Sequence, residues 1–95
     1  MRNFFKMFFN QKPSFKFAVS NNDTDYLIVW IEPWAHDFTL EPGEDIQIIC
    51  DSAEADMDIH RKNGLMQIYL NSSCSFIVQQ QGKTINCGHK RKPDL

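Results

Sequence analysis

The chain lacks the features that mark membrane, phosphate-binding and disulfide-rich proteins. Its longest apolar run, Leu27–Ile31, is strand-sized, whereas a membrane-spanning helix needs about 20 apolar residues, so we expect no transmembrane segment. Only four glycines are present, and they form no Gly-rich phosphate loop. The three cysteines, Cys50, Cys74 and Cys87, are odd in number and widely spaced, which is typical of buried thiols, although a single bridge is compatible with them. These features, with no cleavage site after the aromatic start, predict a cytoplasmic protein.

Positive charge is missing from the middle of the chain. Residues 21–59 contain eleven acids and no Lys or Arg, whereas the segments on either side are basic. We expect the basic ends to lie against the acidic middle; the alternative is a basic patch for an anionic partner and an acidic patch for a cationic one. The run Lys90-Arg91-Lys92 has the charge to contact nucleic acid. Because no basic strand is interleaved with aromatic residues, we do not expect a nucleic-acid partner.

Short alternating segments separated by turn residues cover most of the 95 residues. With 42% hydrophobic residues and a net charge of −2, the chain suits one domain with one core. The strand-like segments are 14–20, 26–32, 38–40, 45–51, 54–60, 65–71, 74–80 and 83–89. They predict an all-β fold: a small antiparallel β-sandwich or partly open barrel of about seven strands over residues 14–89. An aromatic and basic segment, 1–13, precedes it, and a polar tail, 90–95, follows, which we expect to be frayed.

Two of these segments carry specific expectations about burial. Segment 26–32 is apolar on both faces, which predicts a central strand that has Trp30 in the core and ends before Pro33. Segment 54–60 alternates strictly, so Ile59 is expected on the core face and the acids on the wet face.

Two dipeptides carry specific expectations about turns. Pro42-Gly43 has the pattern of a type II turn, and we expect it to join 38–40 to 45–51 in a hairpin. Asn63-Gly64 is the strongest hairpin signal in the chain.

Four phenylalanines gather near the start of the sequence. Their spacing would place them on one face of a short N-terminal helix, where they would form an assembly surface or bind a membrane surface or a partner's groove; they are Phe4, Phe5, Phe8 and Phe9. The favoured alternative is that this segment covers an open edge or end of the sandwich, or forms a strand, because so short a segment gains little from a membrane without a second anchor.

The run IVWIEPWAHDFTLEPGEDIQI contains two tryptophans, a Glu-Pro-Trp sequence and a Pro-Gly-Glu turn. It resembles a pattern in an uncharacterised family of small bacterial β-sandwich proteins, in which a strand ends in Glu-Pro-Trp and a polar, aromatic link leads to Pro-Gly-Glu and the next strand. The resemblance covers about a quarter of the chain. It implies a β-sandwich and no assigned activity, and it transfers no catalytic residue.

The same corner supplies the candidate binding site. Trp34 follows a proline outside the expected sheet, and other aromatic and polar side chains lie close to it in sequence; the candidates are Glu32, Trp34, His36, Asp37 and Phe38. Tryptophan anchors many recognition sites, so a protein or a small ligand would suit this corner. The favoured alternative is that Trp34 folds back and plugs the open end of the sandwich, because a small domain needs every large apolar group it has.

Catalytic and metal-binding patterns are weak. No Met follows Cys87-Gly88-His89, as a blue-copper site requires, and no closely spaced cysteine pair suggests zinc. No nucleophile motif is present, so we expect no cofactor, metal or catalytic residue. The sequence therefore favours a non-enzymatic binding or assembly module with an unknown protein partner or self-association. The alternative is a small metal- or ligand-binding protein that uses His36, His60, His89 and nearby acids.

Overall fold

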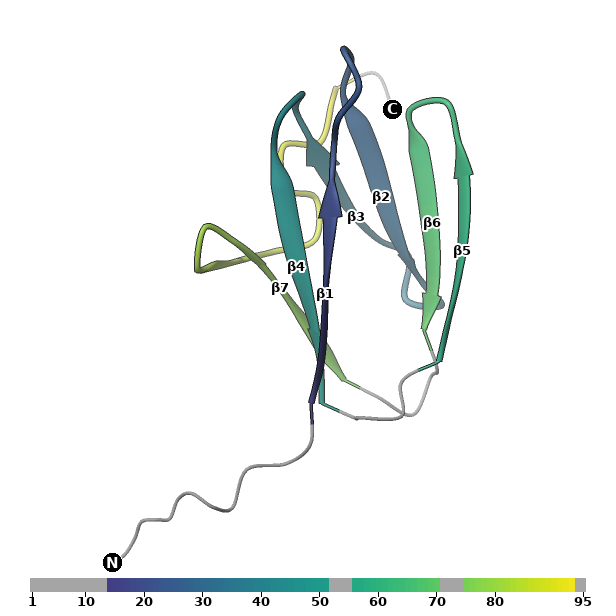
Figure 1. Cartoon of the computed structure of the whole chain (residues 1–95), viewed down its shortest axis with the longest axis vertical. Helices are drawn as coiled ribbons and strands as arrows, with labels where there is room; N and C mark the ends of the chain where they lie inside the picture. Colours follow the sequence, from purple (N-terminus) through teal and green to yellow (C-terminus); the bar gives the residue numbers. More distant parts are fainter. Residues whose placement is uncertain (1–13, 52–55, 71–74, 94–95) are drawn as a thin grey trace, which may run out of the picture.

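The computed structural model describes residues 14–51, 56–70 and 75–93, and within these ranges it contains eight strands and no helix, hence none that could cross a membrane (Figure 1). The strands are β1 (Phe15–Ser20), β2 (Leu27–Glu32), β3 (His36–Leu40), β4 (Asp45–Cys50), β5 (Met57–Lys62), β6 (Leu65–Leu70), β7 (Phe76–Gln80) and β8 (Lys83–Ile85). The predicted all-β sandwich is therefore confirmed, with eight strands in place of about seven. The assembly residues proposed from the sequence, Phe4, Phe5, Phe8 and Phe9, lie outside the described residues.

The strands form two four-stranded sheets, with the orders β1-β4-β7-β8 and β3-β2-β6-β5. Neighbouring strands are antiparallel with one exception, the parallel pair of β2 and β6. The expectation of a purely antiparallel sandwich is wrong at this pair. Between β2 and β6 the chain forms β3, crosses to the other sheet as β4 and returns as the edge strand β5, after which β6 runs in the same direction as β2.

The core lies between the two sheets and follows the period-two alternation of the strands. Its buried members are Val19, Leu27, Val29, Ile31, Phe38, Leu40, Ile46, Ile48, Cys50, Met66, Ile68, Leu70 and Val78. Both sheets contribute to this single cluster. The hydrophobic effect therefore holds the two sheets together, because their apolar side chains are removed from water.

Trp30 was expected in the core, but it lies on the outer face of its sheet. The alternating residues of β2 that point inward are Leu27, Val29 and Ile31, all fully buried. Trp30 has the opposite orientation and is only half-buried, opposite Asp37 of β3. The strand β2 is apolar on both faces, as predicted. Because successive side chains point to opposite faces, Trp30 lies on the outer face of the sheet.

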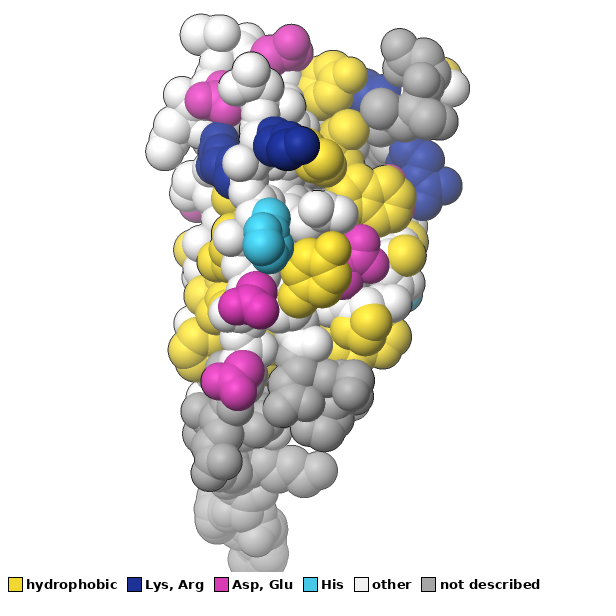
Figure 2. All heavy atoms as spheres, turned by 90° about the vertical axis from the view of Figure 1, so that its right-hand side faces the viewer, with side chains coloured by type: hydrophobic (Ala, Val, Ile, Leu, Met, Phe, Trp, Pro, Cys, Tyr) yellow, Lys and Arg dark blue, Asp and Glu magenta, His cyan; other side chains and the backbone are white. Residues whose placement is uncertain are grey.

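Ile59 was also expected on the buried face, yet 52% of it is exposed. It pairs with the buried Ile68 of β6, but β5 is an edge strand at the rim of its sheet. Of the β5 side chains, Met57 alone packs against the core. Figure 2 shows the side on which β5 and β6 lie, where apolar side chains alternate with acidic, basic and histidine ones.

The Pro42-Gly43 turn has the predicted geometry but a different role. Gly43 has a φ of 85°, and the Glu44 amide donates to the Glu41 carbonyl at 3.0 Å, as in a type II turn. However, β3 and β4 belong to different sheets, so the expected hairpin is wrong and the turn joins the two layers. The Asn63-Gly64 hairpin is confirmed, since these two residues connect the paired strands β5 and β6.

Asn21 holds this connection in place. It is fully buried, its amide donates to the Glu44 carbonyl at 2.9 Å, and its carbonyl accepts from the Gly43 amide at 2.8 Å. Its side-chain Nδ2 donates to the carbonyls of Asp25 and Leu40, each at 2.9 Å. The end of β1 is thereby fastened to the end of β3 and to the turn before β4.

We expect Asn21→Ala to destabilise the fold by about 1–3 kcal/mol, because the buried Leu40 carbonyl loses its donor. Chemical denaturation would measure the change. Asn22→Ala, at the exposed neighbouring position, is the matched control and should leave the unfolding midpoint nearly unchanged. Equal effects of the two substitutions would contradict the role given to the Asn21 side chain.

Candidate functional site

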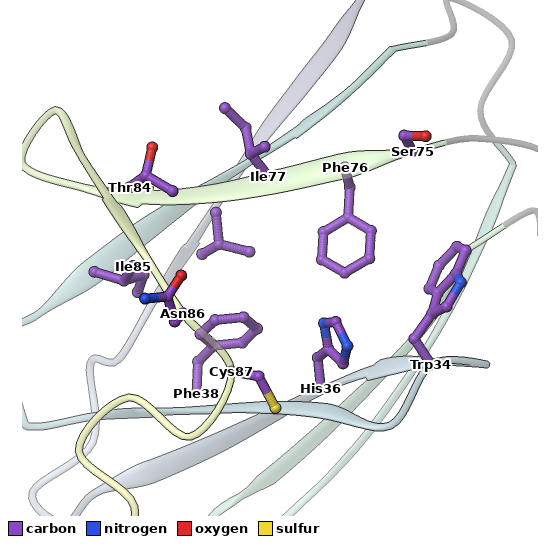
Figure 3. Close-up of a pocket in the computed structure, with 11 residues that line it drawn as sticks. Trp34, His36, Phe38, Ser75, Phe76, Ile77, Thr84, Ile85, Asn86 and Cys87 are labelled. Carbon is purple, nitrogen blue, oxygen red and sulfur yellow. The ribbon is translucent and has the colours of Figure 1, made fainter.

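A groove of ≈ 370 Å³ opens between the sheets beside β3 and β7 (Figure 3). Most of its lining is apolar or aromatic, with a few polar groups; the residues are Trp34, His36, Phe38, Ser75, Phe76, Ile77, Val78, Thr84, Ile85, Asn86 and Cys87. This volume and this mixture are typical of binding sites for small ligands or single side chains. The structure thus brings together three of the five residues proposed from the sequence: Trp34, His36 and Phe38.

Local register places these three side chains. His36 and Phe38 pair with the inward-facing Ile31 and Val29, so they point between the sheets. The chain leaves β2 through a cis peptide bond between Glu32 and Pro33, and Trp34 lies in the short turn that follows. The predicted strand end before Pro33 is confirmed.

Three aromatic rings form one end of the groove. The Phe76 ring centroid lies 5.1 Å from that of Trp34 and 5.6 Å from that of His36, and both pairs are tilted. Figure 3 shows Phe76 and His36 pointing toward each other from the two sheets. Trp34 is half-buried and packs against the core, so it covers the end of the sandwich and also forms a wall of the groove.

Two polar groups in the groove retain hydrogen-bonding capacity. Within the described residues, the structure shows no hydrogen bond to the imidazole of His36 or to the side-chain amide of Asn86. Both offer a donor and an acceptor beside an apolar surface. A bound group with a carbonyl or an amide would find partners there.

Asp37, the fourth proposed residue, does not line the groove. It points to the outer face of β3, is 1% exposed, and accepts hydrogen bonds from the Arg91 Nε at 2.9 Å and the Arg91 Nη2 at 2.5 Å. The hydrogen bonds from Arg91 hold the pKa of Asp37 below its ordinary value of 3.8, although burial acts in the opposite direction. Asp37 therefore anchors the C-terminal segment. The fifth residue, Glu32, ends β2 half-buried and outside the groove lining.

Residues 86–92, which we call the C-terminal strap, cross from one sheet to the other. The Gly88 amide donates to the Asp37 carbonyl at 2.7 Å, and the Thr39 amide donates to the His89 carbonyl at 2.9 Å, so the strap pairs with β3. Asn86 and Cys87 at its start line the groove. The strap therefore closes one side of the groove and ties β8 to β3.

Ion pairs fasten the strap to the acidic middle of the chain. Besides the pair with Asp37, Lys90 lies 2.6 Å from Glu44, and Lys92 lies 2.6 Å from Glu41. The hydrogen bond from Lys90 also lowers the pKa of Glu44. The expected pairing of basic and acidic segments is confirmed for this run, and the expectation of a frayed tail is wrong for residues 90–92.

Sequence reasoning missed Phe76 and Asn86, and it considered Cys87 as a copper ligand but not as part of this groove. Phe76 occupies an apolar position of an alternating strand, as any core residue does, and no local sequence signal indicates that this strand faces Trp34. Cys87 was expected to be buried, but it is exposed, with its sulfur 3.6 Å from the Asp37 Oδ1. Only the path of the strap brings Asn86 and Cys87 to the groove.

The three histidines considered for metal binding lie in separate environments. His36 is in the groove, the His60 ring packs edge-on against Tyr69 at 5.6 Å, and His89 hydrogen-bonds to the Gln80 side chain at 3.1 Å. Within the described ranges no three His, Cys, Asp or Glu side chains are grouped as metal ligands would be. The alternative of a site shared by these histidines therefore has no support from the geometry.

The chain matches no protein-family model, no curated protein and no solved structure. The resemblance of its Glu-Pro-Trp and Pro-Gly-Glu run to a bacterial family consequently stays a prediction.

We expect Arg91→Gln to lower the melting temperature at pH 7, because it leaves the buried Asp37 carboxylate without its counter-charge. In the native protein the pKa of Asp37 is lowered on folding, so its stabilising contribution is complete above pH 3.8 and is lost as the pH falls through the lowered value. In Arg91→Gln burial raises the pKa of Asp37, because no counter-charge remains. Protonation of Asp37 at acid pH then removes the free-energy cost of a buried, unpaired carboxylate. The difference between the two melting temperatures should therefore narrow as the pH falls, first through the raised pKa of Asp37 in the variant, above 3.8, and then through its lowered pKa in the native protein.

Arg61→Gln is the matched control, since Arg61 pairs with Asp23 in the open, with 53% of the Asp23 side chain exposed. Melting curves of the native protein, Arg91→Gln and Arg61→Gln, measured from pH 7 to pH 3, would test this prediction. A pH-independent effect of Arg91→Gln, or an effect no larger than that of Arg61→Gln, would contradict the anchoring role of Asp37.

Proposed function

We propose that this protein is a non-enzymatic binding module whose groove between the sheets receives an apolar, preferably aromatic, side chain of a protein partner. The observation that carries the proposal is the groove itself, which places a Trp34–Phe76–His36 cluster at one end and the strap at the other. Aromatic pockets of this kind supply much of the binding energy at protein interfaces.

The polar groups of the groove suit a polypeptide ligand. The imidazole of His36 and the amide of Asn86 lie at two separate points of the lining, as Figure 3 shows. A side chain that enters between them would bring its own backbone amide and carbonyl within reach of such groups. The neighbouring β8 pairs with β7 alone among the described strands, which leaves an edge where an extended partner segment fits.

A catalytic role has less support. Cys87 is the only described cysteine that lines the groove, and its sulfur contacts Asp37 and Arg91. The structure shows no hydrogen bond from a described histidine to this thiol, although a nucleophilic cysteine needs such a base. The groove therefore offers recognition groups and no activated nucleophile.

Other parts of the proposal follow from charge. Lys90, Arg91 and Lys92 have their charges paired within the chain, which favours a partner other than nucleic acid. The edge strand β5 carries exposed Asp58, His60, Arg61 and Lys62, and such charges protect an edge from pairing with a second copy. We therefore favour a different protein over self-association through β5. A cytoplasmic location also stays part of the proposal, on the cysteine pattern and the lack of a cleavage-site pattern after the aromatic start.

The groove can be tested with a defined side chain and an internal reporter. In a Trp30→Phe protein, Trp34 becomes the only tryptophan, and it forms a wall of the groove. We expect N-acetyl-phenylalanine amide to change the Trp34 emission saturably, whereas N-acetyl-alanine amide should not. In the reciprocal Trp34→Phe protein, which keeps the outer Trp30, neither compound should produce a saturable change.

The contribution of His36 is measured by the same titration. His36→Ala should weaken binding of the phenylalanine amide about 2- to 13-fold, the equivalent of one net hydrogen bond of about 0.5–1.5 kcal/mol. His60→Ala, on the exposed strand β5, is the control and should bind like the parent. Identical responses to the two amides, or equal affinities of the two histidine variants, would overturn the proposal.

A further inference from the structure

A second apolar hollow lies at the sheet that contains β4 and β7, and it shares Ser75, Phe76 and Ile77 with the groove. Its floor is formed by Ile49 and Ile77, which are cross-strand partners, and its volume is ≈ 280 Å³. The alternating residues Ile48 and Val78 are buried in the core, so the two isoleucines point outward. Ile77 is 46% exposed, which makes it one of the large apolar side chains that the described sandwich leaves in contact with solvent.

The rim of this hollow is formed where the described chain begins. Ser14 lines the hollow, together with Asp51 and Ser75, whose backbones are joined by a hydrogen bond from the Asp51 amide to the Ser75 carbonyl at 3.0 Å. A second bond, from the Ser75 amide to the Asp51 Oδ1 at 2.9 Å, holds the carboxylate at the rim. Any chain that precedes Ser14 therefore starts beside the hollow.

We propose that the Phe-rich segment 1–13 of the same molecule binds this hollow and covers Ile49 and Ile77. The segment contains four phenylalanines, and the nearest, Phe9, is five residues from Ser14. Five residues span at most about 17 Å, and the hollow begins at Ser14 itself, so the tether is long enough. Because the segment is attached to the rim, its local concentration at the hollow exceeds that of any segment from a second molecule.

The carboxylate at the rim attracts the same occupant, whereas Lys16, the exposed cross-strand partner of Ile49, opposes it, so the tether favours this occupant more strongly than charge does. Segment 1–13 carries Arg2, Lys6 and Lys12 and no acid, whereas the rim carries the exposed carboxylate of Asp51. The inference does not rest on the proposed function, since the floor residue Ile49 does not line the groove and Ile77 points away from its interior in Figure 3, although Ser75 and Phe76 line both the groove and the hollow. It assigns the phenylalanines an intramolecular role in place of an assembly surface.

Methyl NMR on the full chain tests this assignment. In protein labelled at the isoleucine δ1 methyl groups, phenylalanine rings that cover the hollow should shift the Ile77 resonance upfield. Replacing Phe4, Phe5, Phe8 and Phe9 by serine should abolish that shift and leave the Ile59 methyl unchanged. Ile59 is the matched control, because it is exposed to a similar degree on β5, in the other sheet.

The unsubstituted chain decides the case even if the serine variant fails to fold. Nuclear Overhauser contacts between the Ile77 methyl and the rings of residues 4–9 are expected within one molecule. An Ile77 resonance that does not respond to the serine substitutions, or an absence of such contacts, would overturn the proposal. Contacts that occur only between differently labelled molecules in a mixed sample would also overturn it, since they would show exchange between copies.

Discussion

The ion pair between Asp37 and Arg91 is the interaction on which the candidate site depends. A carboxylate that is 1% exposed needs a counter-charge, and Arg91 supplies it with two hydrogen bonds from a segment 54 residues away in the sequence. The pair lies on the outer face of β3, while the groove lies on its inner face. Fixing the strap on one side of this strand therefore determines the wall of the groove on the other.

The same strand explains why the tryptophan corner combines packing with recognition. His36 and Phe38 point inward and Asp37 points outward because alternate residues of a strand face opposite sides. Trp34 precedes the strand and packs on Phe76 from the opposite sheet. Residues that are adjacent in the sequence therefore have different roles. Asp37 binds the strap, whereas Trp34, His36 and Phe38 line the groove.

The sequence predicted the elements better than their partners. Alternation located nearly every strand, and Pro42-Gly43 identified a type II turn, because both are set by local backbone chemistry. The assignment of β3 and β4 to one hairpin was wrong, because the bonds that send the chain across the sandwich come from Asn21, a distant buried side chain. Similarly, Trp34, His36 and Phe38 could be proposed from their clustering, whereas Phe76, Asn86 and Cys87 join them only through tertiary structure.

The central claim is that the Asp37–Arg91 pair holds the strap against β3, and native-state hydrogen exchange tests it most directly. The amides of Gly88 and Thr39 donate the hydrogen bonds that join strap and strand. In the native protein they should be protected, and in Arg91→Gln they should exchange much faster while the amides of β4, in the other sheet, keep their protection. Unchanged protection of Gly88 and Thr39 in that variant would contradict the claim, because the strap would then be held without its ion pair.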